Sequence, residues 1–88
     1  MTKVMGSREQ HLYEITVDAL LDNGETIDEA FVKSFVSKVY KLERILGDSE
    51  YRNEFAPEVI PNLELAIMDV GVNVLGLTKE QVEKIKNA

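Results

Sequence analysis

The only histidine of the chain, His11, stands close to three carboxylates that recur at helical spacing. Glu14, Asp18 and Asp22 follow it at intervals of three, four and four residues, so on a helix the four side chains share one face. Imidazole and carboxylate groups are the side chains that general acid–base catalysis and metal binding most often use. This face is therefore the first place to look for chemistry.

Neither form of chemistry has the residue pattern that it requires. A serine triad needs a nucleophile beside the histidine, but the sequence contains no serine in the G-x-S-x-G pattern of a nucleophile elbow, and the chain has no cysteine. A di-metal carboxylate site needs Glu-x-x-His units on two helices, whereas His11 and Glu14 form one unit in the reverse order. The loop at Gly24 is not a calcium loop, because Ala19 and Leu21 stand where the first oxygen ligands belong. We therefore expect a solvated acidic face in a protein that is not an enzyme and has no metal site and no cofactor.

A basic stripe runs against the overall charge of the chain, which is −6 at pH 7. Lys33, Ser37, Lys41 and Arg44 are spaced by four, four and three residues and so share one helix face. This face is either solvated or paired with nearby acidic side chains, such as those of the first helix, or it is a docking face for an acidic partner or a phosphate. Only Tyr40 could add aromatic stacking, which argues against single-stranded nucleic acid.

The C-terminal residues 70 to 87 resemble a helix-turn-helix unit. The turn glycine, the capping residue and the inward apolar positions recur at the spacing that holds a recognition helix across a supporting one: Leu75, Gly76, Leu77, Thr78, Val82 and Ile85. The resemblance implies that four polar residues would face the major groove of DNA: Thr78, Lys79, Gln81 and Lys86. Val72 stands where a small residue is usual, and Glu80 and Glu83 would meet phosphates. A purely structural helix corner is therefore the alternative.

The stretch from residue 61 to residue 75 is the most apolar part of the chain, and we expect the fold to be organised around it. At 100° per residue its polar side chains fall mostly on one stripe, which leaves apolar side chains on both flanks. One flank carries Leu63, Ile67, Val70 and Val74, and the other carries Leu65, Met68, Val72 and Leu75. A helix that is apolar on both flanks must be covered on two sides, and a chain of 88 residues has few other helices with which to cover it. We predict that the second flank binds a partner protein.

The remaining elements are predicted from caps and apolar periodicity. Three capping-box patterns open helices at residues 7, 26 and 78: Ser7 with Gln10, Thr26 with Glu29, and Thr78 with Gln81. The second helix should span residues 27 to 46, with this buried arc: Ile27, Phe31, Val32, Phe35, Val39, Leu42, Ile45 and Leu46. Gly71 inside the central helix predicts a close crossing with another helix. The short connection at residues 23 to 26 predicts that the first two helices form an antiparallel hairpin.

These patterns predict an all-α fold in which the hairpin of residues 7 to 46 packs on a third apolar helix and a short fourth helix follows at the C-terminus. Residues 7 to 88 should form one domain, and residues 1 to 6 a flexible end. A composition of 44% hydrophobic and 30% charged residues is that of an ordinary globular chain. The absence of cysteine and of a signal-like or membrane-spanning run predicts a cytoplasmic protein.

The function that these features favour is a small acidic protein-interaction module, such as an adaptor, inhibitor or assembly factor, that also self-associates. We expect a protein partner or a second copy of the chain, no membrane and no evident small-molecule substrate. Nucleic acid is disfavoured by the negative charge. A DNA-binding transcriptional regulator that uses residues 70 to 87 is the alternative.

Overall fold

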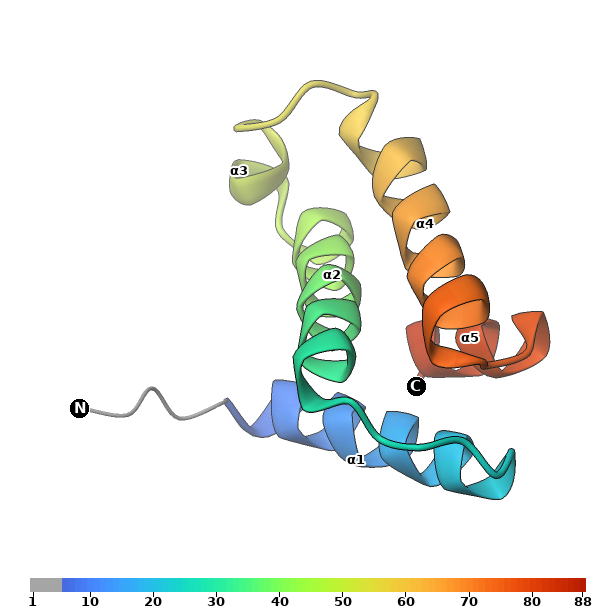
Figure 1. Cartoon of the computed structure of the whole chain (residues 1–88). Coiled ribbons are helices and arrows are strands. Elements are labelled where there is room, and N and C mark those ends of the chain that lie inside the picture. Colours follow the sequence, from blue (N-terminus) through green and yellow to red (C-terminus); the bar gives the residue numbers. More distant parts are fainter. Residues whose placement is uncertain (1–5) are drawn as a thin grey trace.

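The computed structural model describes residues 6–88, and every regular element among them is a helix (Figure 1). The helices are α1 (Ser7–Asp22), α2 (Glu29–Gly47), α3 (Ser49–Arg52), α4 (Val59–Asp69), the π-helix η1 (Val70–Leu75) that continues α4, and α5 (Lys79–Lys86). The predicted all-α fold and the short C-terminal helix are confirmed. Of the predicted flexible end at residues 1 to 6, all but Gly6 lies outside the described residues. Among residues 6–88 no helix is both long enough and apolar enough to span a lipid bilayer.

The helices are arranged around α2, which α1 crosses and beside which α4 runs (Figure 1). α5 turns beneath the end of α4 and η1 and also contacts α1. The predicted antiparallel hairpin of the first two helices is not confirmed, because α1 runs across α2 rather than alongside it. The physical reason lies in the first helix, which buries only a narrow stripe of Leu12, Thr16 and Leu20. Such a stripe serves a crossing contact with two neighbours better than a long parallel one.

The core is built mainly from α2, whose buried residues recur at helical spacing. They are Val32, Phe35, Val36, Val39, Leu42 and Ile45. The α1 stripe, Ile67, Leu75, Leu77, Val82 and Ile85 complete the apolar interior. Two residues of the predicted buried arc lie outside it, because Phe31 and Leu46 are exposed at the two ends of α2. The predicted arc is therefore right in its centre and too wide at its ends.

The start of α2 differs from the predicted capping box. Asp28, and not Thr26, is the N-cap, since its carboxylate accepts hydrogen bonds from the backbone N–H groups of Ala30 and Phe31. Glu29 is consequently the first helical residue rather than the third. Asp and Thr are both good N-caps, and the carboxylate has the added advantage of a negative charge at the positive end of the helix.

The close crossing predicted at Gly71 is confirmed. A Cβ atom at this buried residue would lie 2.6 Å from Val82 Cγ2 and 2.9 Å from Phe35 Cε1, which is closer than side chains pack. Gly71 thus lets the backbone of η1 approach α2 and α5 directly. The π-helix itself was not predicted. It ends at Gly76, whose φ of 92° lies in the left-handed region that glycine adopts without strain.

Candidate interaction surface

A groove of about 390 Å³ lies on the side of α4 that faces away from the core. Its lining comprises Leu65, Met68, Asp69, Val72, Asn73 and Lys79. The side chain of Leu65 is 70% exposed, the highest value among the large exposed apolar side chains. Met68 and Val72, which line the same groove, are half-buried and pack against the core. Three of the four predicted partner-binding residues therefore lie together on one open surface.

The orientation of this surface follows from the residues that α4 buries. Ile67 and Gly71, four residues apart, face the core. Leu65 is two residues from Ile67, which is about 200° around an α-helix, so its side chain points away from the core. The fully buried line of the central helix thus runs through Ile67 and Gly71, while Met68 and Val72 beside it are partly buried against the core. The other helices of the described chain leave Leu65 open and cover Met68 and Val72 in part.

Leu75, the fourth predicted partner-binding residue, does not belong to this surface. It is only 7% exposed and packs in the core. The widened turn of η1 changes the angular spacing after Val70, so positions that share a flank on an ideal α-helix diverge here. A contact between Leu75 and a partner is excluded while the domain stays folded as described.

Asp69, Asn73 and Lys79 form the polar rim of the groove. Asn73 Nδ2 donates a hydrogen bond to Asp69 Oδ1 at 2.8 Å. Lys79 is exposed, and within residues 6–88 its ammonium group has no carboxylate within ion-pair distance. Lys79 is also the first residue of α5, where the helix dipole disfavours a positive charge. The groove therefore combines apolar side chains with a lysine that finds no anion in the described part of the chain.

The basic residues of α2 do not form one uniform face. Lys33 is exposed, whereas Lys41 Nζ lies 5.0 Å from the centre of the Phe55 ring and the Arg44 guanidinium lies 4.0 Å from that of Tyr51. The two rings meet edge to face at 5.1 Å between centres. None of the three basic residues forms an ion pair with α1, whose whole length the structure describes. Two of them instead help to hold the segment around α3 against α2 by cation–π contacts.

The C-terminal corner uses two of the four predicted DNA-contacting residues for its own architecture. Thr78 and Gln81 form the predicted capping box, with Thr78 Oγ1 accepting from Gln81 N at 3.1 Å and Gln81 Oε1 accepting from Thr78 N at 2.9 Å. The Gln81 amide also exchanges hydrogen bonds of 2.7 and 3.0 Å with the Asn23 amide of the α1–α2 connection. Gln81 is therefore committed to the fold, and the Thr78 hydroxyl is partly occupied by the cap.

Lys86, the last of these four residues, forms ion pairs at the C-terminal end of α5. Its Nζ lies 3.3 Å from Glu83 Oε1 and 3.7 Å from Glu64 Oε2, and its side chain is only 14% exposed. These contacts join the end of α5 to α4. The structure thus does not bring the four predicted DNA contacts together as one free basic face.

The acidic face of α1 lies partly beside α5. His11 and Glu14 are exposed, whereas Asp18 and Asp22 line a cleft of about 410 Å³ that Lys84 of α5 also lines. Across the described chain, from Gly6 to Ala88, no group of three or more His, Cys, Asp or Glu side chains has the geometry to hold a metal ion.

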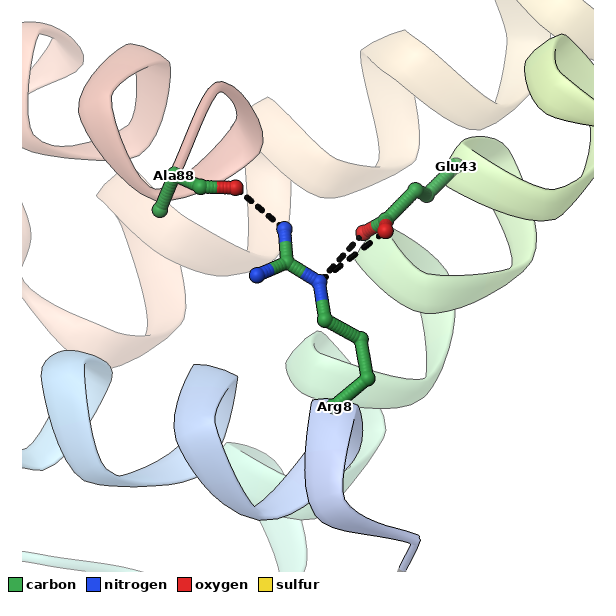
Figure 2. Close-up of polar contacts among 3 residues, drawn as sticks. All are labelled: Arg8, Glu43 and Ala88. Carbon is green, nitrogen blue, oxygen red and sulfur yellow. Dashed lines mark hydrogen bonds and ion pairs between the residues drawn. The ribbon is translucent and has the colours of Figure 1, made fainter.

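Sequence reasoning missed a contact that ties three parts of the chain together (Figure 2). Arg8 Nε donates to both carboxylate oxygens of Glu43, at 2.9 and 3.0 Å, and Arg8 Nη2 donates to the main-chain carbonyl of Ala88. The start of α1 is thereby joined to α2 and to the chain beyond α5. No spacing rule could have found it, because the partners are 35 and 80 residues away.

Comparisons of this chain with protein-family models, with curated proteins and with solved structures found no match. The interpretation of the groove therefore rests on its own geometry and chemistry.

Proposed function

We propose that this protein is a non-enzymatic interaction module that binds another protein through the outer side of α4. The observation that carries the proposal is the 70% exposure of Leu65 over half-buried Met68 and Val72 in an open groove. Burying a leucine side chain contributes about 1.5–3 kcal/mol, so an apolar cluster left in water is a ready binding surface. We call the side chains of Leu65, Met68 and Val72 the α4 ridge; they form the apolar part of the groove lining, and Val72 belongs to η1, which continues α4.

The energetic argument for the α4 ridge is that its outermost residue adds little to the fold of the isolated chain. Leucine contributes little to an exposed helix position beyond what glutamate or lysine would give, since the helix propensities of these residues are similar. A polar residue at position 65 would serve solubility better. An exposed leucine above two further apolar side chains therefore supports a role in binding.

A DNA-binding regulator is the weaker candidate. It would rely on α5, but Gln81 and Lys86 are engaged within the chain, and the exposed side of α5 also carries Glu80 and Glu83. The charges of these two carboxylates cancel those of the two exposed lysines, Lys79 and Lys84, so this side of α5 has no net attraction for phosphates. We favour protein binding for this reason. We also propose a cytoplasmic location, since a chain without cysteine makes no use of an oxidising compartment.

The test is affinity capture from the cells that make the protein, with the wild type, Leu65→Asp and Leu21→Asp as baits. Leu21 is a matched control because it is also an exposed leucine, at 59%, but lies on α1 away from the groove. Both variants should keep the helical content of the wild type, because both side chains are exposed. We expect a protein that the wild type and Leu21→Asp retain and that Leu65→Asp loses. Capture that is the same for all three baits would overturn the proposal.

A further inference from the structure

The α4 ridge is bordered at its two ends by charges of opposite sign. Glu58 is the N-cap residue of α4, and its backbone angles are helical. It precedes Leu65 by seven residues, so on an α-helix the two side chains point in directions only about 20° apart. Lys79 borders the groove next to Val72. Both side chains are exposed, and neither forms an ion pair with any residue from Gly6 to Ala88. Along the ridge the order is therefore an anion, three apolar side chains and a cation.

This order is self-complementary. When two copies of such a surface meet with their α4 helices antiparallel, the negative end of each faces the positive end of the other, and the apolar middles coincide. A parallel arrangement would instead bring like charges together. A twofold axis between residues 68 and 69 sets Leu65 against Val72 of the other copy along the helix. Lys79 lies in α5, beyond the turn at Gly76, and lines the same groove, so in the antiparallel arrangement it faces the end that carries Glu58 of the other copy.

We propose that the α4 ridge binds a second copy of this chain, with the two α4 helices antiparallel about a twofold axis near Met68. In this arrangement Leu65 packs on Val72 of the partner subunit, the two Met68 side chains meet on the axis, and Glu58 pairs with Lys79 of the partner subunit at both ends. Methionine is well suited to the axis, because its unbranched side chain adapts to its own copy. The inference rests on the proposed function and specifies its partner.

The position of Lys79 at the start of α5 adds a reason for it to pair with a carboxylate of another molecule. A cation in the first turn works against the helix dipole, and the described chain offers Lys79 no carboxylate in compensation. The dimer supplies that carboxylate from Glu58 of the partner subunit. Residues that disagree with their local element often serve a contact made elsewhere.

The two Asp69 carboxylates are the one unfavourable feature of the dimer. They flank the axis, where like charges repel, and the hydrogen bond from Asn73 to Asp69 Oδ1 offsets part of the charge. Asp69→Asn should consequently tighten the dimer. A heterologous partner gives no reason to expect that effect, so this variant tests the symmetry of the contact.

The experiment is sedimentation equilibrium of the purified chain from micromolar to millimolar concentration. We expect a monomer–dimer equilibrium that Leu65→Asp abolishes and Leu21→Asp leaves unchanged. Glu58→Lys and Lys79→Glu should each weaken the dimer by about tenfold, because each reverses the charge at both ends of the interface. The double variant Glu58→Lys/Lys79→Glu should recover the wild-type dimer to within about threefold, since it restores opposite charges.

A chain that stays monomeric at millimolar concentration overturns the dimer, and so does a double variant no tighter than either single one. These results leave the proposed function standing when capture of a different protein still depends on Leu65. Capture that is indifferent to Leu65→Asp would instead remove the proposed function itself.

Discussion

Replacing Gly71 by alanine tests the packing from which the orientation of α4 follows. The new methyl carbon would lie 2.6 Å from Val82 Cγ2 and 2.9 Å from Phe35 Cε1, and both neighbours are fully buried. Overpacking of this kind costs about 1–3 kcal/mol. Alanine regains about 1 kcal/mol of helix propensity over glycine. Since neither neighbour has a free path to move away, the overpacking cost should lie in the upper part of this range, at about 2–3 kcal/mol. We therefore expect Gly71→Ala to lower the free energy of unfolding by about 1–2 kcal/mol.

The measurement is urea denaturation followed by far-ultraviolet circular dichroism, with the slope against denaturant compared between variants. Gly47→Ala is the matched control, because Gly47 also lies in a helix but a Cβ atom added there would meet no atom within 4 Å. It should be neutral or more stable by up to about 1 kcal/mol. In thermal melts each kcal/mol corresponds to about 4–8 °C for a domain of this size.

A double variant tests whether the loss of stability in Gly71→Ala comes from the close contact with Val82. Val82→Ala alone leaves a cavity, but combined with Gly71→Ala it removes the closest clash, so the double variant should lose less stability than the sum of the two single ones. Gly71→Ala at wild-type stability, or additivity of the two changes, would refute the close crossing of η1 with α5.

Three further predictions concern contacts that hold the helices together. Thr78→Ala removes the N-cap of α5 and should cost about 0.5–2 kcal/mol in urea denaturation, while Thr78→Ser should restore most of it. Arg8→Gln should lower the free energy of unfolding by no more than about 1 kcal/mol, because Arg8 and Glu43 are both partly exposed, and the effect should shrink in high salt. A larger loss that does not depend on salt would contradict a surface ion pair between Arg8 and Glu43. Burial, followed by the nearby Glu29 carboxylate, raises the pKa of Tyr13 above its usual value of 10.0. Folding therefore disfavours the phenolate, so the contribution of Tyr13 to the free energy of unfolding should be constant below pH 10 and fall above it. Tyr13→Phe should reduce this fall in denaturation curves measured at a series of pH values.

Local signals in the sequence were enough to predict the helices and the sharpest of their boundaries. Apolar spacing predicts α1 and α2, and the Thr78 and Gln81 pair opens α5 as expected. The first capping box failed for a local reason. The N-cap is Gly6, which has no side chain to accept a hydrogen bond. Ser7 is the first residue inside the helix, one position after the N-cap, so its hydroxyl does not cap the helix.

Tertiary geometry was beyond these signals. The crossing of α1 over α2 depends on how a narrow buried stripe is shared between α2 and α5, which periodicity within one helix cannot report. The contacts of Lys41 and Arg44 with aromatic rings were equally hidden. Tyr51 and Phe55 come from the irregular segment around α3, and no helical spacing relates them to α2.

The candidate surface was predicted in part because the central helix is apolar on both flanks and periodicity alone cannot rank them. Gly71, from which the close crossing was predicted, also indicates which line of the helix is buried, and the prediction did not use it for that purpose. Ile67, Gly71 and Leu75 are spaced by four, and the line that contains the smallest residue is the one that can approach another helix most closely. Had this line been taken as the buried one, Leu75 would have been assigned to the core, while Leu65 would have kept its predicted place on the surface.

The close approach at Gly71 and the exposure of Leu65 are therefore two results of one rotation of α4. Turning the helix to bury Leu65 would move Gly71 away from Phe35 and Val82 and bring a larger side chain to the crossing, where even a methyl group has no room. The fold cannot hide the α4 ridge by a small adjustment. Leu65 and the exposed parts of Met68 and Val72 stay in water unless another molecule covers them, so the packing that stabilises the domain is also what presents its proposed binding surface.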